Sequence, residues 1–554
     1  MLLLRRSAML RQHARRSAPL VAAAARPLCT MPTTELVRNE EMPGRLTKIV
    51  ATIGPASEEA EPLQECVAAG MNVMRVNFSH ATLDEFMLRL TNLRASEGGR
   101  TVAVMLDTKG PEIRMGGLKV CKETGNRKAK MTLVAGEALE LTSDAAFDGA
   151  SDEKTLYIDY PKLPEVVKVG DKVLLDDGLV TLRVTDVPAG GGVVRTEVLN
   201  SSEIGERKGV NLPGVATGLP AMSDKDKADI KLGVEHDIDM VAASFVRSAD
   251  GVHEIRQYLR ECVEGLAPAG PGEAMPGHFE PGHTGYRATA DAPPPPLPLI
   301  ISKIESTEAL DQLPEIIDAS DGIMVARGDL GVEVPLESVA TWQKEMVEMC
   351  IAAGKPVIVA TQMLETMQKN PRPTRAEVSD VTTAVLDGAD AVMLSGESAN
   401  GQYPVESVAT QAAIARHAEE WLLSRGTGAE RFEPLLEEYS DTAEDGIGAA
   451  AAYLADRVGA NAIVVLDESD GLVTRSVAKC KPSVAIAAVS SCLKTCRQLN
   501  LVRAVEPIYV EPTGAEVDGD LSVLDDVLAA SDRFSEGDLV VVVDPSMAIQ
   551  LSHL

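Results

Sequence analysis

The sequence predicts an α/β protein built on a (β/α)8 TIM barrel. Strand-like apolar runs recur along the chain, each followed by a turn and an amphipathic helical stretch, and eight of them precede residue 405. The composition, 45% hydrophobic but only 3% aromatic, is typical of this class. A doubly wound sheet is the competing architecture, but it would place a glycine-rich phosphate fingerprint after an early strand, and the sequence has none.

The predicted strands are short runs rich in Val, Ile, Leu and Ala. In chain order they are Thr47–Ile53, Asn72–Asn77, Thr101–Leu106, Asp239–Ser244, Leu299–Ile304, Gly322–Ala326, Pro356–Ala360 and Ala391–Leu394. Two stretches interrupt the repeat. Residues 112–213 switch to short alternating runs broken by Gly, Asp and Pro, which predicts an inserted all-β lid domain. The barrel would therefore comprise residues 45–111 and 214–404.

The second interruption, residues 265–298, holds nine Pro and six Gly and has almost no apolar periodicity. It is expected to form a surface loop insertion. After the barrel, residues 405–554 resume the alternation, with strands expected at Ala462–Leu466, Val484–Val489 and Leu539–Val543. This segment is predicted to be a separate C-terminal α/β domain.

The first 34 residues carry six arginines and no acidic residue, and they differ sharply from the rest of the chain. This pattern indicates an organellar transit peptide, with a mitochondrial destination expected first and a plastid as an alternative. A start at Met31 would instead make the protein cytoplasmic.

The charge balance excludes several classes of partner. The chain has 53 Lys and Arg against 83 Asp and Glu, giving a net charge of −30, so nucleic acid is not expected as a partner. No run approaches the roughly 18–20 apolar residues of a transmembrane helix, and no membrane partner is expected. The eight cysteines include no CxxC pair, which argues against a disulfide framework or a structural zinc site.

Polar residues end several of the predicted strands, at the barrel rim where catalytic groups gather. They are Arg75 to His80, Asp107-Thr108-Lys109, Lys303-Ile304-Glu305, Arg327-Gly328-Asp329, Thr361-Gln362 and Ser395-Gly396-Glu397. Glu305 and Asp329 offer hard oxygen ligands suited to Mg²⁺ or Mn²⁺. Four cations, Arg75, Lys109, Lys303 and Arg327, would bind a multiply charged anion such as phosphate. A site that combines positioning with charge neutralisation fits phosphoryl transfer.

Several of these segments together resemble the pyruvate kinase family. The segments are Arg75 to His80, Asp107 to Arg114, Ile301 to Glu305, Met324 to Gly331, Ala360 to Leu364 and Met393 to Glu397, and the similarity runs from about Arg45 to the end. The resemblance implies transfer of the phosphoryl group of phosphoenolpyruvate to ADP, giving pyruvate and ATP.

The resemblance also implies roles for matching residues. Lys303 would neutralise charge on the transferring phosphoryl group, and Arg75 would bind that phosphate. Gly328, Asp329 and Thr361 would surround the carboxylate end of the substrate, with Thr361 or a water chain beside it as the proton donor to the enolate. Glu305 and Asp329 would ligate Mg²⁺.

Potassium and nucleotide contacts follow from the same resemblance. Asn77, Ser79, Asp107 and Thr108 would bind K⁺, and Glu112, where some relatives have Lys, implies K⁺ dependence. The nucleotide would contact six residues: Asn77, Phe78, Ser79, His80, Arg114 and Lys208. Three residues also have simpler interpretations. His80 could cap a helix, and Lys208 could be an ordinary surface charge. Ser244 could be a packing residue or contact the potassium site.

The C-terminal domain and the assembly carry two further expectations. The acidic turn from Asp467 to Gly471 would repel a bisphosphate, so activation by fructose 1,6-bisphosphate is not expected. A homotetramer is implied by the resemblance alone.

Two other functions compete with phosphoryl transfer. One is a barrel enzyme that uses Lys303 as a Schiff-base lysine. The other is a non-enzymatic regulatory or scaffolding subunit.

Overall fold

The structure, a computed structural model, describes residues 44–189, 192–266, 296–425, 442–467, 470–510 and 535–554. The predicted transit peptide and almost all of the Pro/Gly-rich insertion lie outside these residues, as do Glu468 and Ser469 of the acidic turn. Among the described helices, none has the length and apolar character that a membrane crossing requires.

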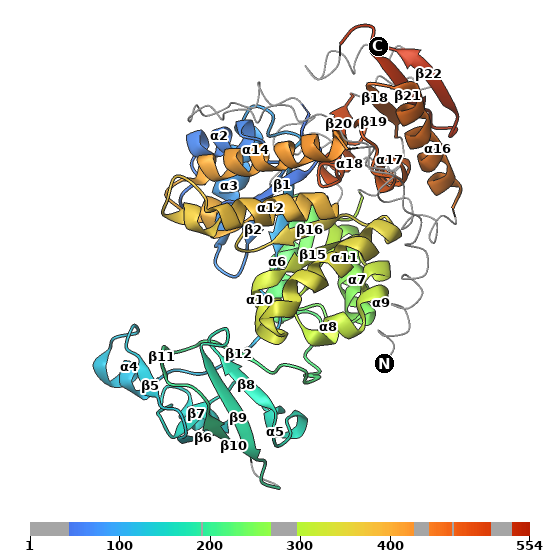
Figure 1. The fold of residues 1–554 in the computed structure, drawn as a ribbon. Coiled ribbons are helices and arrows are strands. Elements are labelled where there is room, and N and C mark those ends of the chain that lie inside the picture. The colour runs from blue at the N-terminus through green and yellow to red at the C-terminus, as the bar shows by residue number, and fades with distance from the viewer. Residues whose placement is uncertain (1–43, 190–191, 267–295, 426–441, 468–469, 511–534) are drawn as a thin grey trace, which may run out of the picture. The chain divides into compact units, whose positions relative to one another are not determined.

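Eight parallel strands close into a barrel (Figure 1), which confirms the predicted fold class. Around the barrel they neighbour one another in the order β1-β17-β16-β15-β14-β13-β3-β2. Their bounds are β1 (Lys48–Thr52), β2 (Val73–Asn77), β3 (Ala103–Asp107), β13 (Met240–Ala243), β14 (Leu299–Ile304), β15 (Gly322–Ala326), β16 (Val357–Ala360) and β17 (Ala391–Leu394). All eight coincide with the predicted runs to within two residues at each end.

The barrel strands are apolar throughout because both of their faces are buried. In β1, Val50 points into the barrel with Val73 and Met105, whereas Ile49 and Ala51 pack outward against the surrounding helices. This alternation fills the interior with side chains, so the barrel is a packed core and the chemistry is confined to its rim.

Helices follow the strands and cover the barrel. They are α2 (Ala60–Ala68), α3 (Leu83–Ala95), α6 (Asp224–Glu235), α7 (Ala249–Glu264), α8 (Thr307–Asp311), α9 (Leu313–Ala319), α10 (Arg327–Glu333), α11 (Val339–Ala353), α12 (Arg375–Asp387), α13 (Gly396–Ala399) and α14 (Pro404–Leu423). Capping boxes start α3 with Thr82 and Glu85 and α12 with Thr374 and Glu377. The Thr82 cap shows that His80 does not cap α3.

The segment inserted after β3 forms a seven-stranded sheet with a small two-stranded one beside it. The larger sheet has the order β4 (Ile113–Arg114), β12 (Gly209–Asn211), β8 (Lys172–Leu175), β9 (Val180–Asp186), β10 (Val193–Val198), β6 (Ala138–Thr142) and β7 (Thr155–Tyr157). The smaller sheet pairs β11 (Ser202–Ile204) with β5 (Met131–Leu133). Short helices α4 (Lys119–Thr124) and α5 (Leu163–Val166) depart from the all-β prediction.

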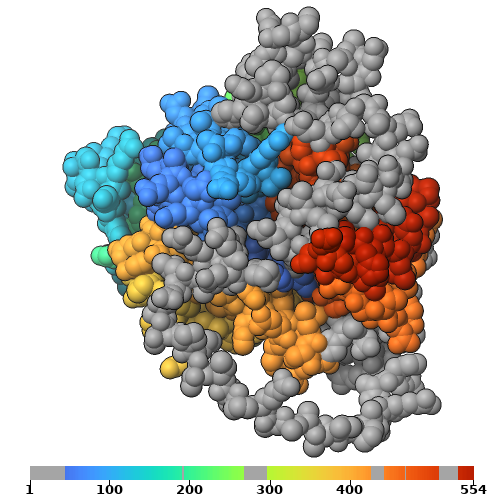
Figure 2. All heavy atoms as spheres, turned by 90° about the horizontal axis from the view of Figure 1, so that it is seen from above, coloured from blue at the N-terminus to red at the C-terminus, as the bar shows by residue number. Residues whose placement is uncertain are grey.

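The C-terminal domain has a five-stranded sheet in the order β20-β19-β18-β21-β22. Its elements are α16 (Ala443–Val458), β18 (Ala462–Leu466), α17 (Leu472–Lys479), β19 (Ala485–Ser490), α18 (Leu493–Leu499), β20 (Val505–Tyr509), β21 (Leu539–Val543) and β22 (Ile549–His553). The strands β20 and β22 were not predicted. The edge strand β22 pairs antiparallel with β21, and the C-terminal part of the chain is the red region in Figure 2.

The C-terminal domain holds the end of the barrel where the strands begin. Leu501 joins the core cluster inside the barrel. Buried Arg497 lies 2.7 Å from Asp239 Oδ1 and 2.5 Å from Asp237 Oδ2, just before β13. Asp239 in turn accepts a hydrogen bond from the Val104 amide on β3. These contacts fix the N-terminal ends of the neighbouring strands β3 and β13. The C-terminal ends of the same strands therefore present their side chains in a defined arrangement.

Candidate active site

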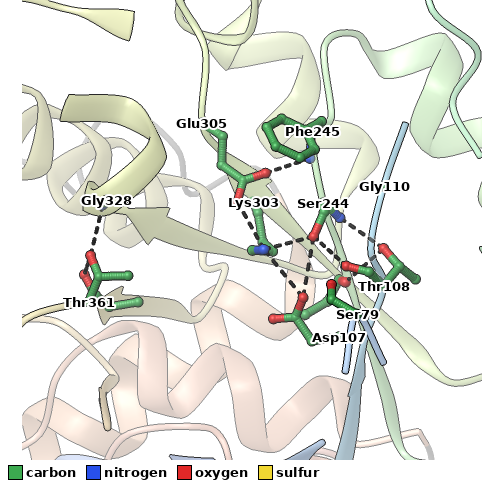
Figure 3. A network of polar contacts seen from close by, with 12 residues as sticks. Ser79, Asp107, Thr108, Gly110, Ser244, Phe245, Lys303, Glu305, Gly328 and Thr361 are labelled. Carbon is green, nitrogen blue, oxygen red and sulfur yellow. Dashed lines mark hydrogen bonds and ion pairs between the residues drawn. The ribbon is translucent and has the colours of Figure 1, made fainter. Parts of the chain in front are cut away.

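Four charged side chains meet where β2, β3 and β14 end. Arg75 comes from β2, Asp107 from β3, and Lys303 and Glu305 from the end of β14. Figure 3 shows Asp107, Lys303 and Glu305 turned toward one another. Each is less than 10% exposed. Isolated buried charges would be very unfavourable, so this cluster is stable only because opposite charges pair within it.

Asp107 joins the two cations. Its Oδ2 lies 2.6 Å from Arg75 Nε, and its Oδ1 lies 3.3 Å from Lys303 Nζ. Burial alone would raise the pKa of Asp107, but Arg75 and Lys303 outweigh it and hold the pKa below its usual value. Asp107 is therefore ionised throughout the neutral range. Arg75 is oriented further by the Thr52 hydroxyl, 2.7 Å from one of its terminal nitrogens.

Lys303 lies between two carboxylates and a hydroxyl. Besides Asp107, its Nζ contacts Glu305 Oε1 at 2.9 Å and Ser244 Oγ at 2.7 Å. Burial favours the neutral amine, yet the negative charges of Asp107 and Glu305 raise the pKa of Lys303 above its ordinary value. The side chain is thus a permanent ammonium aimed at the rim.

Glu305 and Asp329 form a pair of like charges beside this ammonium. Glu305 is held by the Phe245 amide, which donates to its Oε2 at 2.6 Å. Burial and then the charge of Glu305 raise the pKa of Asp329 to about 7. Two adjacent carboxylates suit a divalent cation, which would relieve the repulsion between them. Within the described ranges no cluster of three such ligands occurs, so water or substrate oxygens would complete the coordination of Mg²⁺.

The four predicted potassium ligands gather on adjoining strand ends. Asn77 on β2 is the register partner of Asp107 on β3, and Thr108 follows directly. Asn77 Oδ1 accepts a hydrogen bond from the Ser79 amide at 3.0 Å, which turns the chain back toward the rim. The set offers only oxygen donors, as a hard monovalent cation requires.

Thr361 lies at a sharp turn after β16. Thr361 and Gln362 both have left-handed backbone angles, with φ of 70° and 56°. Its hydroxyl accepts a hydrogen bond from the Gly328 amide at 2.9 Å, at the start of α10. A strained turn persists only where its surroundings enforce it.

Arg327 enforces that turn, and the prediction that it helps to bind the substrate anion is wrong. Its guanidinium donates to the carbonyls of Ala360 at 3.0 Å and Thr361 at 2.6 Å, and it forms a two-pronged ion pair with Asp380. All of its donors are directed at the protein, so Arg327 positions Thr361.

A cleft of about 680 Å³ lies at this rim, lined by Asp329 and Phe245 among others, and its size is typical of small-molecule sites. Asn77, Ser79, His80 and Arg114, four of the six predicted nucleotide contacts, line it, as do Lys109 and Asp329. Glu112 also lines it, 2.6 Å from Arg114 and 3.7 Å from Lys109.

The other two predicted nucleotide contacts lie elsewhere. Phe78 is buried and packs edge-on against Phe86, with ring centroids 5.2 Å apart. Its amide donates to the Asp107 carbonyl and its own carbonyl accepts from Lys225, so the Phe78 ring is part of the core and does not line the cleft. A nucleotide contact of Phe78 stays a prediction. Lys208 pairs with Asp176 at 3.0 Å and is not among the cleft-lining residues.

Sequence reasoning missed Thr52 and Asp177. Thr52 ends the first strand, and the rule that polar residues at strand ends gather at the rim could have found it. Ser244, which ends the fourth strand, was expected only as a packing residue or a potassium contact, and its contact with Lys303 was not predicted. Asp177 lines the cleft from the lid, in a turn where Asp176 and Asp177 have φ of 52° and 54°. Its Asp-Asp-Gly sequence indicates a turn but gives no sign that the turn faces the barrel.

Comparison with known proteins decides the family. Residues 44–266 and 298–408 match the family model described as the pyruvate kinase barrel domain, and residues 445–548 match the pyruvate kinase alpha/beta domain. The chain belongs to the pyruvate kinase family. The family model thus divides at the Pro/Gly-rich insertion.

Individual pyruvate kinases from distant organisms are similar to the chain. It is 42% identical over 503 residues to pyruvate kinase of Geobacillus stearothermophilus, covering 90% of this chain and 77% of the relative. It is 42% identical over 490 residues to the human pyruvate kinase PKLR, covering 86% and 78%. A crystal structure of a pyruvate kinase from Cryptosporidium parvum superposes with a TM-score of 0.79 at 33% identity, covering 92% of this chain and 96% of the other.

The raised pKa of Asp329 predicts pH-dependent metal binding in this pyruvate kinase family member. Protons and a divalent ion would compete for Asp329, so the metal affinity should be highest above pH 7 and should be lost as the pH falls through about 7. Isothermal titration with Mn²⁺ should show roughly tenfold weaker binding at pH 6 than at pH 8. Equal affinity at the two pH values would contradict the carboxylate pairing.

Proposed function

We propose that the chain transfers the phosphoryl group of phosphoenolpyruvate to ADP, giving pyruvate and ATP, with Mg²⁺ or Mn²⁺ and K⁺ as cofactors. The observation that carries this proposal is the permanently charged Lys303 ammonium beside the Glu305 and Asp329 carboxylates at the barrel rim. Phosphoryl transfer needs positioned charge rather than a protein nucleophile, and the cluster supplies such charge.

The substrate would lie between two parts of the rim. Arg75 and Lys303 present positive charge to the phosphoryl group. At the other side, the Gly328 amide and Thr361 hydroxyl lie 2.9 Å apart and can turn to the carboxylate end of the substrate. Arg327 keeps Thr361 beside the methylene carbon that takes up a proton when the enolate becomes pyruvate. Thr361 itself or a water held by it would deliver that proton.

The cations are held by the chain's oxygens. Glu305 and Asp329 would hold the divalent ion, which neutralises phosphoryl oxygens and aligns the substrates when it is bound. Asn77, Ser79, Asp107 and Thr108 would hold K⁺ next to the phosphate-binding Arg75. Asn77, Ser79, His80 and Arg114 would contact the nucleotide in the cleft, with Lys208 reaching it after release from Asp176.

The Schiff-base alternative fits the site less well. A lysine that attacks a carbonyl must lose its proton, and Asp107 and Glu305 favour the protonated form of Lys303. Borohydride reduction in the presence of pyruvate should therefore leave Lys303 unmodified in a mass spectrum. The scaffolding alternative requires a broken site, whereas Arg75, Lys303, Glu305, Asp329 and Thr361 are all present.

The proposed activity and its potassium requirement can be measured together. Pyruvate formation from phosphoenolpyruvate and ADP, followed with lactate dehydrogenase, should be rapid with Mg²⁺ and K⁺ and strongly reduced when K⁺ is replaced by tetramethylammonium. Glu112→Lys should restore activity without K⁺, because an ammonium near the rim can replace the ion. No activity with both cations would contradict the proposed function, and full wild-type activity without K⁺ would contradict only the role of Glu112.

We also propose that fructose 1,6-bisphosphate does not activate this enzyme. Asp467 already occupies the start of α17: its carboxylate accepts hydrogen bonds from the Thr474 amide at 3.1 Å and hydroxyl at 2.6 Å, and from the Gly471 amide at 3.3 Å. A phosphate at this turn would have to displace that carboxylate and meet Asp470 as well. Adding the bisphosphate at subsaturating phosphoenolpyruvate should leave the rate unchanged, whereas a several-fold rise would contradict this role of Asp467.

The oligomeric state and the cellular compartment of the protein are proposed from the family resemblance and from the N-terminal sequence. We propose a homotetramer on the family resemblance. We propose mitochondrial import on the arginine-rich, acid-free first 34 residues, with a cytoplasmic product from Met31 as the alternative.

A further inference from the structure

Ser244 occupies a central position in the rim cluster that the mechanism above leaves unused. It follows β13 directly and is 4% exposed. Its amide donates to Thr108 Oγ1 at 3.1 Å, which ties it to the end of β3. The residue is therefore fixed by backbone contacts before its side chain makes any.

The hydroxyl proton of Ser244 has a clear acceptor. Ser244 Oγ lies 2.7 Å from the Thr108 carbonyl oxygen and 3.3 Å from Asp107 Oδ1, so the proton goes to the carbonyl. The oxygen lone pairs then face Lys303 Nζ, 2.7 Å away (Figure 3). Ser244 acts as a hydrogen-bond acceptor for the ammonium.

The Lys303 ammonium donates hydrogen bonds to Ser244 at 2.7 Å and Asp107 at 3.3 Å, and Glu305 Oε1 lies 2.9 Å away as an ion-pair partner without a hydrogen bond of its own. A phosphoryl group that approaches the ammonium meets these three partners and would exchange with one of them. Asp107 also forms an ion pair with Arg75, and Glu305 also accepts a hydrogen bond from the Phe245 amide. Ser244 makes the shortest contact and is the one neutral acceptor of the three.

We propose that Ser244 is a positioning residue that holds the Lys303 ammonium in place while a carboxylate contact is exchanged for the phosphoryl group. The inference rests on the proposed function, because it concerns the lysine assigned to that transfer. A neutral acceptor suits this task, since its bond to the ammonium changes little when charge moves in the site. Phe245, the next residue, holds Glu305 through its amide, with φ of 55°. Two consecutive residues thus fix the separation of Lys303 and Glu305.

The test removes the Ser244 hydroxyl and compares the effect with the loss of another buried serine hydroxyl, that of Ser302. Ser244→Ala should lower kcat roughly 10- to 100-fold, because a displaced ammonium meets the phosphoryl group less well. The KM for ADP and the Mn²⁺ dissociation constant should change less than twofold, since neither the cleft nor the Glu305 and Asp329 carboxylates are altered. Ser302→Ala is the control: Ser302 is also buried on β14, but its hydroxyl faces Ser320 Oγ at 2.6 Å.

The outcomes separate the possibilities. A kcat for Ser244→Ala within threefold of Ser302→Ala would overturn the positioning role, and so would a loss of Mn²⁺ affinity that parallels the loss of kcat, which indicates general damage to the site. If Ser244→Ala does not fold, Ser244→Cys keeps a side chain with a much weaker acceptor and should show the same separation of kcat from Mn²⁺ affinity. A wild-type enzyme that forms no pyruvate would refute the proposed function instead.

Discussion

The pairing of the buried Asp107 carboxylate with Arg75 and Lys303 is the constraint on which the rest of the site depends. These cations would be costly to bury without a counter-charge, and Asp107 supplies it to both at once. Because the carboxylate belongs to β3 and the cations to β2 and β14, the pairing also requires strands that are distant in sequence to end at one rim. The closed barrel provides that arrangement.

The same arrangement explains why the protein combines a strongly negative net charge with anionic substrates. Salt in solution screens the net charge of the protein over long distances, whereas the rim cations act at contact distance inside a buried cluster. Opposite the site, Arg497 and Leu501 of the C-terminal domain hold the other ends of the strands. The catalytic geometry is therefore supported from the far end of the barrel as well as from within the rim.

Much of the fold and the core of the site could be predicted from the sequence. Apolar runs of strand length recur eight times, and the polar residues that end them must meet at one edge, so Asp107, Lys303 and Glu305 could be placed together without a structure. The roles of Arg327 and Phe78 could not. Arg327 also follows a strand, but its partner Asp380 lies 53 residues on, and Phe78 points inward although its neighbours line the cleft. Side-chain direction and long-range pairing are set by packing that no local pattern records.

The most direct test of the proposed role of Lys303 is the turnover of Lys303→Met, measured beside its thermal unfolding. If the ammonium neutralises charge on the phosphoryl group during transfer, kcat for pyruvate formation falls by about 10³-fold or more while the folded protein still binds Mn²⁺. A Lys303→Met enzyme that folds and keeps more than a tenth of the wild-type kcat would contradict this role.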